Sequence, residues 1–403
     1  MKFGKHRQVE YASVMLFGVV SNAALGGVAL VTAREVTTGL RGQFIIGLAI
    51  SSILSVFATF GLNISARAGL RAEPRAHYLG SYLAASSLLS VTCALIAPPL
   101  FILALRHPSS AGADAAAIFI QCTSLTLALL LVEGIHAVNR HGIASSFDAI
   151  GSVSGLLSMI GYLWTSSTPT LAGMLIALSV GNVLQIIICL AVLSREDDFL
   201  TSTLIDLRRL FTRSRGNHGT VVGVALLIKM DRYVVGFVLG PTAVSFYATA
   251  ATVSEFLWLP AQGLANYFYS ATSSPRSLER LTRRLFLALA LCGLIIGFLS
   301  PLLIRTLFGA AYTPSAHLVW LFLPGSLAMT VYFLDSARLM GQGRGRETRH
   351  QLILPLVILL VGTSVVAQRL GLNAAAVSCS LAYIVLMASA RQATKGRHRM
   401  YET

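Results

Sequence analysis

The sequence predicts an all-α membrane protein with twelve membrane-spanning helices in two sets of six and with both termini in the cytoplasm. The first observation is composition: 55% of the residues are hydrophobic and 12% are charged, whereas soluble domains carry about 25% charged residues. The second is a series of apolar stretches, each near the roughly 20 residues that a helix needs to cross a bilayer. The third is the placement of Lys and Arg almost entirely in every second gap between those stretches.

The predicted spans follow the chain in order, each an apolar stretch bounded by a polar gap. They are residues 11–33, 42–62, 78–104, 115–138, 143–164, 169–193, 219–240, 243–268, 284–304, 315–338, 350–368 and 371–390. The first span follows a basic start, as the core of a signal peptide does, but its apolar run is too long and a second span follows closely. We therefore expect an uncleaved first helix.

The charge pattern supports both the number of spans and their orientation. Basic residues gather at the N-terminus, in the gaps after every even-numbered span and at the C-terminus, whereas the opposite gaps hold few. Positive residues stay on the cytoplasmic side during insertion, so the pattern predicts a multi-pass protein of the cytoplasmic (inner) membrane. The net charge of +15 then reflects orientation and attraction to anionic membrane lipids, and we expect no nucleic-acid partner.

The longest gap divides the chain into three predicted parts. Residues 1–193 form an N-terminal six-helix bundle, residues 194–218 a cytoplasmic linker, and residues 219–403 a C-terminal six-helix bundle with a short basic tail. Apolar and basic residues mix over 203–213, which predicts a short amphipathic helix on the inner leaflet. Two equal halves indicate an internal repeat of the kind found in secondary transporters.

Prolines interrupt four of the predicted spans. Each removes a backbone hydrogen bond and can kink its helix. One interpretation is ordinary irregularity of membrane helices; the other is that kinked helices line a cavity and bend during a conformational change. The prolines are Pro98 with Pro99, Pro260, Pro324 and Pro355.

Motifs of soluble enzymes are missing from the sequence. It contains no P-loop, no HExxH and no nucleophile elbow, and the glycine-rich run over 341–346 is not flanked by a strand. All five cysteines lie inside predicted spans without a CxxC pair, which favours packing over disulfides or metal binding. We expect neither an enzyme nor a bound cofactor or metal.

Ionisable residues inside the spans are the informative ones, because a charge in a bilayer is costly unless it is paired or faces water. Lys229, Asp231 and Arg232 lie near the middle of span 219–240, and Glu255 near the middle of span 243–268. Lys229 and Arg232 are three residues apart and share one helical face. They indicate either a neutralising ion pair between helices or a net-cationic cavity for an anionic headgroup, in which Asp231 and Glu255 couple to an ion or balance charge.

Other acidic residues in spans receive structural interpretations. Asp335 and Arg338 are three residues apart near the cytoplasmic end of their span, which predicts a structural ion pair. Glu133 and Asp148 lie near the cytoplasmic ends of their spans, where we expect water to solvate them.

A family resemblance rests on the seventh and eighth spans. KMDRYVVGFVLGP covers Lys229–Pro241, and AVSFYATA follows from Ala243. This segment resembles the pattern of polysaccharide-repeat flippases, the O-antigen and capsule export branch of the multidrug/oligosaccharidyl-lipid/polysaccharide (MOP) superfamily. There an Asp-Arg pair, an apolar run and a Leu-Gly-Pro turn precede a Gly-x-Tyr-x-x-Ala helix start; Ser245 replaces the glycine here. The N-terminal half is more divergent, with residues 35–41 in place of the usual proline-containing turn.

The resemblance implies two six-helix bundles around a central cavity and an alternating-access cycle. The family substrate is a sugar repeat linked to polyprenyl pyrophosphate, moved outward during surface polysaccharide biosynthesis alongside glycosyltransferases and a polymerase. We expect Lys229, Arg232, Tyr247 and Asn266 to line the substrate cavity. Whether H⁺ or Na⁺ is also coupled to transport is left open by the sequence. The phosphate charge would then be offset by charge-assisted hydrogen bonds.

Three alternatives remain open. A cation-coupled small-molecule exporter of the same superfamily is expected to carry acids facing the cavities of its lobes, and span 11–33 has none. A flippase for lipid-linked peptidoglycan precursors usually has two further helices. A membrane-embedded glycosyltransferase normally has a large outer loop, whereas the outer gaps here are short.

Overall fold

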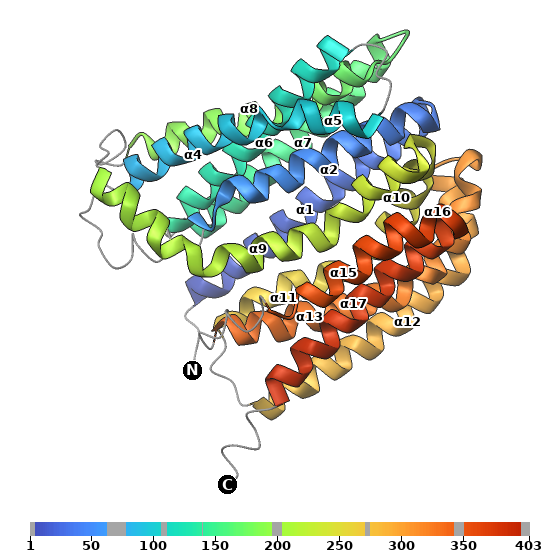
Figure 1. Ribbon diagram of the computed structural model, residues 1–403. Coiled ribbons are helices and arrows are strands. Elements are labelled where there is room, and N and C mark those ends of the chain that lie inside the picture. Colours follow the sequence, from blue (N-terminus) through green and yellow to red (C-terminus); the bar gives the residue numbers. More distant parts are fainter. Residues whose placement is uncertain are drawn as a thin grey trace. The chain divides into compact units, whose positions relative to one another are not determined.

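The computed structural model describes residues 5–62, 78–105, 111–138, 140–195, 204–270, 275–341 and 350–395, and all regular structure in these ranges is helical. The chain forms two compact units, Met1–Val222 and Gly223–Thr403, which follow each other in the colour order of Figure 1. The division falls within one long helix, α9 (Leu204–Leu239). Of the predicted linker 194–218, residues 194–195 follow the end of α8, residues 196–203 lie outside the described residues, and the rest belongs to α9.

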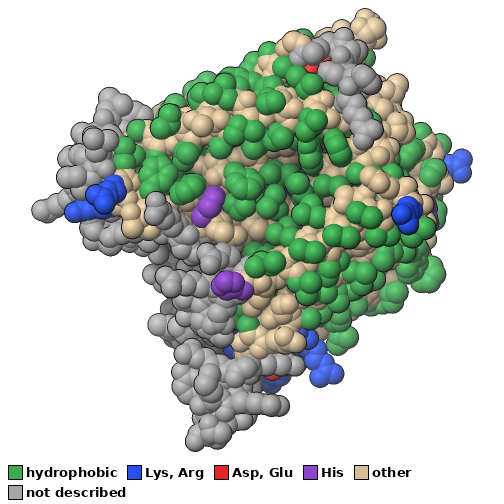
Figure 2. Space-filling view, in the orientation of Figure 1, with side chains coloured by type: hydrophobic (Ala, Val, Ile, Leu, Met, Phe, Trp, Pro, Cys, Tyr) green, Lys and Arg blue, Asp and Glu red, His purple; other side chains and the backbone are tan. Residues whose placement is uncertain are grey.

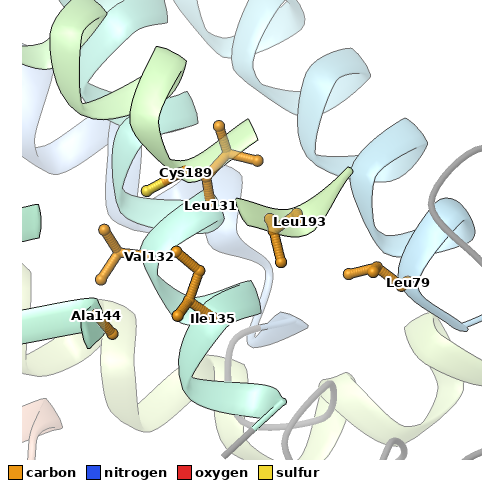
Figure 3. Packing of buried hydrophobic residues seen from close by; sticks show 7 residues of the cluster. All are labelled: Leu79, Leu131, Val132, Ile135, Ala144, Cys189 and Leu193. Carbon is orange, nitrogen blue, oxygen red and sulfur yellow. The ribbon is translucent and has the colours of Figure 1, made fainter. Parts of the chain in front are cut away.

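The first unit is built around α6. In chain order its helices are α1 (Lys5–Glu35), α2 (Thr38–Thr59), α4 (Tyr78–Ala94), α5 (Ala97–Leu105), α6 (Ala111–Ala137), α7 (His141–Thr165), α8 (Leu171–Leu193) and the start of α9. Helix α6 packs against α2, α4, α5 and α8, while α7 packs against α1 and α8. Figure 3 shows one result, a buried apolar cluster in which Leu131 and Ile135 of α6 meet Leu79 of α4, Ala144 of α7 and Cys189 of α8.

Local signals in the sequence explain several helix ends in this unit. Thr37 and Thr170 cap α2 and α8 by accepting from the backbone N–H groups of Leu40 and Gly173, as threonine does at helix starts. Helices α7 and α8 approach closely because both carry glycine where they cross: a Cβ on Gly181 would lie 2.2 Å from the carbonyl oxygen of Gly151. Small residues are the usual means of close helix packing in membranes.

The second unit is built around α13. After α9 come α10 (Pro241–Glu255), α11 (Leu259–Ser270), α12 (Pro275–Leu307), the 3₁₀ turn η1 (Ala310–Ser315), α13 (Ala316–Gly341), α15 (Ile353–Val361), the π-helical turn η2 (Gly362–Val366), α16 (Ala367–Leu370) and α17 (Leu372–Lys395). Helix α13 packs against α10, α11, α12 and α17, and α15 packs against α17.

The two units share one packing scheme. Helices α6 and α13 each correspond to the fourth predicted span of their half. In both halves the fourth span packs against the second, third and sixth, and the fifth packs against the sixth. This agreement supports the internal repeat that the equal division of the sequence indicates.

The chain is a multi-pass membrane protein. Ten helices among the described residues are long and apolar enough to cross a membrane. The two further spans predicted over 219–240 and 243–268 are helical, as part of α9 and as α10 with α11, but one holds Lys229, Asp231 and Arg232 and the other breaks between Glu255 and Leu259. The total of twelve and the orientation of the termini stay predictions.

Helix α12 carries large apolar side chains on its exposed face and glycine on the face that packs against the protein. Leu287, Leu291, Leu294, Phe298 and Leu302 are 52–75% exposed along one face. On the inner side, a Cβ on Gly297 would lie 2.9 Å from the Trp320 ring. Hydrophobic side chains likewise cover much of the described surface on the face shown in Figure 2. Soluble proteins expose polar faces of their helices, so an exposed apolar face is expected where lipid, not water, surrounds a helix.

Helix breaks agree with two of the predicted kinks. Helices α4 and α5 are separated just before Pro98, and α10 and α11 are separated just before Pro260. Helix α13 continues through Pro324, and Pro355 lies in the first turn of α15, where a missing N–H costs little. The π-helical turn η2 has no counterpart in the sequence prediction.

The amphipathic segment 203–213 is a correction. It is helical from Leu204 onward, as predicted, but it runs without a break into the rest of α9. Leu210 is fully buried against Leu62, Tyr82 and Leu130 of the first unit, with Leu207 and Phe211 packed beside it. Its described apolar side chains therefore contact protein, whereas the prediction had them face lipid.

Candidate functional site

The charged residues of the seventh and eighth predicted spans meet inside the second unit. Helix α9 ends at Leu239, and Gly240, with φ of 89°, turns the chain into α10, which begins with Pro241. A glycine adopts that conformation without strain, and proline is favoured at a first helical position. The turn brings Tyr247 and Glu255 of α10 back to the charged residues of α9.

Arg232 forms an interhelical ion pair. Its Nη2 donates to Oε1 of Glu255, and the two side chains are 12% and 22% exposed respectively. The Nε of Arg232 is buried and has no hydrogen-bond partner in the part of the chain that the structure describes. The ion-pair interpretation of these two residues therefore matches the observed geometry.

Asp231 is held differently. It is 2% exposed, and its Oδ2 accepts from the hydroxyl of Tyr247 at 2.9 Å. Its Oδ1 accepts from the backbone N–H of Arg232 at 2.7 Å, and the thiol of Cys379 in α17 lies 3.8 Å from Oδ2. Three donors, the Tyr247 hydroxyl, the Arg232 N–H and the Cys379 thiol, thus hold this carboxylate.

Helix α17 completes the site. Cys379 and Tyr383 are four residues apart and share a face. The hydroxyl of Tyr383 donates to the carbonyl oxygen of Leu227 in α9 at 3.3 Å. Neither residue is charged, so the sequence analysis missed both; a tyrosine one helical turn after a cysteine in an apolar span is the only signal that points to them.

The predicted wall of the substrate cavity needs a correction at Tyr247. Its side chain is completely buried and stacks edge-on against Phe322 of α13, with ring centroids 4.9 Å apart. It therefore supports Asp231 and does not line an accessible cavity. Lys229 is half-buried on α9, one turn from Arg232. The side chain of Asn266, on α11, lies outside the described residues.

The predicted structural ion pair of Asp335 also needs a correction, because its partner differs from the predicted one. The structure pairs Oδ2 of Asp335 with Nε of Arg391 in α17, at 3.7 Å, and not with Arg338 on its own helix. Helices α13 and α17 pack along their length, so a basic residue from the neighbouring helix reaches the carboxylate. Spacing along one helix could not reveal that neighbour.

A second polar cluster lies in the first unit. Oδ2 of Asp148 in α7 accepts from the hydroxyl of Ser21 in α1 at 3.0 Å, and Nε2 of Gln185 in α8 lies 3.4 Å from Oδ1. Ser152 is 2.7 Å from Ser21. Asp148 is half-buried and is hydrogen-bonded to two other helices. The sequence analysis expected water to solvate it at the cytoplasmic edge.

The four ionisable residues of this cluster in α9 and α10 balance in formal charge. Lys229 and Arg232 are matched by Asp231 and Glu255, so the expectation of a net-cationic site does not hold while all four are ionised. The cluster gains positive charge only when a carboxylate is protonated or withdrawn.

Comparisons with known proteins identify the fold. No family model and no curated protein matches the chain. Among solved structures it is similar to an inward-facing multidrug resistance MATE family transporter of the MOP superfamily, with a TM-score of 0.71, 14% identity and coverage of 96% of this chain and 95% of that one.

Two further structures show the same arrangement. The inward closed lipid II flippase MurJ gives a TM-score of 0.76 at 14% identity, covering 96% of this chain and 87% of that one. An outward-facing MATE family transporter gives 0.63 at 14% identity, covering 98% and 95%. The chain therefore has the fold seen in these membrane transporters.

Proposed function

We propose that this protein moves a polyprenyl-pyrophosphate-linked oligosaccharide outward across the cytoplasmic membrane by alternating access. The fold is shared with transporters, and the segment over 229–250 resembles the polysaccharide-repeat flippases. The observation that carries the proposal is Arg232, a cation inside the second unit, because its Nε is buried and has no hydrogen-bond partner among the described residues. Glycosyltransferases supply such a substrate and a polymerase consumes it.

The physical chemistry of that substrate suits the site. The lipid tail can stay in the bilayer while the sugar and the pyrophosphate cross through protein. Arginine binds phosphate through two parallel N–H donors, and Lys229 one turn away adds a second positive charge. An inside-negative potential favours outward movement of an anion, by roughly 4.6 kcal/mol for two charges at 100 mV.

Asp231 and Glu255 are the proposed groups for coupling to H⁺ or Na⁺. They differ in access, because Asp231 is 2% exposed whereas the Glu255 side chain is 22% exposed. Glu255 is therefore the better placed of the two to exchange an ion with the solvent.

A second candidate function is a cation-coupled small-molecule exporter. The similarity to MATE transporters and the Asp148 cluster between α1, α7 and α8 favour it, since the latter places an acid inside the first unit.

Reconstitution into proteoliposomes separates the two functions. A fluorescent lipid-linked oligosaccharide should become accessible to a membrane-impermeant quencher only in vesicles that contain the protein. The matched arm measures efflux of a cationic dye under the same H⁺ or Na⁺ gradient. Dye efflux without lipid movement would reject the flippase in favour of the exporter.

A further inference from the structure

We infer that Arg232 exchanges counter-ions during the cycle: Glu255 neutralises it while the site is empty, and a phosphate group of the substrate displaces Glu255 when it binds. This inference rests on the proposed function and assigns Glu255 the part of a built-in competitor for the substrate anion.

The first support is the incomplete use of the guanidinium. Nε–H and one Nη–H of arginine point the same way and together bind two oxygens of one planar or tetrahedral oxyanion. In the described residues Glu255 contacts Nη2, while Nε is buried and has no partner. A buried unpaired donor is unfavourable, so an oxyanion that takes both donors satisfies Arg232 better than Glu255 does.

The second support is that, among the described residues, Glu255 is held by fewer contacts than Asp231. Asp231 accepts from Tyr247 and from the amide of Arg232 and lies within reach of Cys379. Withdrawing it would break all of these contacts. Glu255 has the more exposed side chain, and Arg232 is the partner that the structure gives it.

The third support is the position of Glu255 on the backbone. It is the last residue of α10, where the partial negative charge of a helix end disfavours a carboxylate. The chain beyond it makes tight turns, with the N–H of Leu257 on the carbonyl of Ser254 and that of Trp258 on the carbonyl of Glu255. Helix α11 starts anew at Leu259, so Glu255 can swing away without unwinding a continuous helix.

The consequence is a change of local charge when the substrate binds. Before the exchange, Lys229 and Arg232 are balanced by Asp231 and Glu255. Afterwards the substrate phosphates face Arg232 and Lys229, and the released Glu255 is free for an ion. Substrate binding and ion binding are then linked through one side chain.

The test compares binding to purified protein in nanodiscs of neutral lipid. The probes are polyprenyl pyrophosphate, the uncharged polyprenol of the same length and inorganic pyrophosphate, measured by calorimetry. Glu255→Gln keeps the shape and removes the charge, so it should bind polyprenyl pyrophosphate roughly fivefold more tightly than wild type, the scale set by loss of a partly exposed ion pair. Its affinity for polyprenol should not change. An equal gain in affinity for inorganic pyrophosphate would show that the phosphates alone drive the exchange. A gain in affinity for polyprenyl pyrophosphate only would show that the exchange also needs the lipid tail.

Controls keep the result interpretable. The double variant Arg232→Gln with Glu255→Gln should lose the gain, and Asp335→Asn, which removes a different ion pair in the same unit, should bind as wild type does. If Glu255→Gln does not fold, as judged by its melting temperature, Glu255→Asp weakens the pair by shortening its reach and should give a smaller gain.

Two negative results have different meanings. If wild type binds polyprenyl pyrophosphate no better than polyprenol, the proposed substrate is wrong. If wild type prefers the pyrophosphate but neither Glu255 variant binds it more tightly, the exchange of counter-ions is wrong and the proposed function stands.

Discussion

Replacing Tyr247 by Phe tests whether this tyrosine supports Asp231 from within the packed unit. The change removes the hydroxyl that donates to Oδ2 of Asp231 at 2.9 Å and leaves the ring, which is fully buried against Phe322. A hydrogen bond to a charged group contributes about 1.5–3 kcal/mol in soluble proteins, but polar pairs in membrane proteins average about 0.6 kcal/mol. Because Asp231 keeps the amide of Arg232 and the thiol of Cys379, we expect a loss of about 1 kcal/mol.

That loss corresponds to a decrease of about 2–4 °C in melting temperature for a unit of this size. The assay is thermal unfolding in detergent, followed by a thiol-reactive dye or by loss of the monodisperse peak in size-exclusion chromatography. Tyr233→Phe is the matched control, because the described residues show no hydrogen bond from that half-buried tyrosine. Equal melting temperatures for the two variants would refute the supporting role of Tyr247.

Three further predictions concern transport, packing and pH. Arg232→Ala and Lys229→Ala should each abolish substrate flipping in proteoliposomes while the protein still inserts, and flipping at the wild-type rate in the double variant would contradict a role in binding. Gly181→Val should destabilise the first unit by more than about 1–3 kcal/mol, because a Cβ there lies 2.2 Å from the carbonyl of Gly151; an unchanged melting temperature would show that α7 and α8 separate easily. Burial lowers the pKa of His218 below its ordinary value of 6.5, so folding favours the neutral ring, and the stability it contributes is present above about pH 6.5 and lost as the pH falls through the lowered pKa. His218→Phe should therefore lose less melting temperature than wild type when the pH falls from 7.5 to 5. An identical slope in the two proteins would show that protonation of His218 does not contribute to the pH dependence.

The helices could be predicted from the sequence because membrane spans are set by composition and length. Ten of the predicted spans recur as long apolar helices. The charged cluster was also visible, since Lys229, Asp231 and Arg232 stand out in an apolar segment. These features depend on residues close together in the chain.

The partners of those residues could not be predicted, because they come from other helices. Nothing near Asp231 in sequence points to Cys379 of α17, and nothing near Asp335 points to Arg391. Tyr247 was assigned to a cavity because a family pattern marks a position, not the direction of a side chain. The amphipathic segment 203–213 shows a related ambiguity, since an apolar face packs equally well against lipid or against protein.

The uncharged length of helix α12 matches the thickness of a membrane. Between Arg284 and Arg305, both exposed, residues 285–304 carry no charge, which at 1.5 Å per residue spans about 30 Å, the thickness of an average hydrocarbon core. With bulky side chains turned outward and glycines inward, this helix has little freedom to sink or tilt alone. In a markedly thinner bilayer the acyl region must stretch or the whole second unit must lean, so lipid chain length becomes a control on how readily this half of the protein moves.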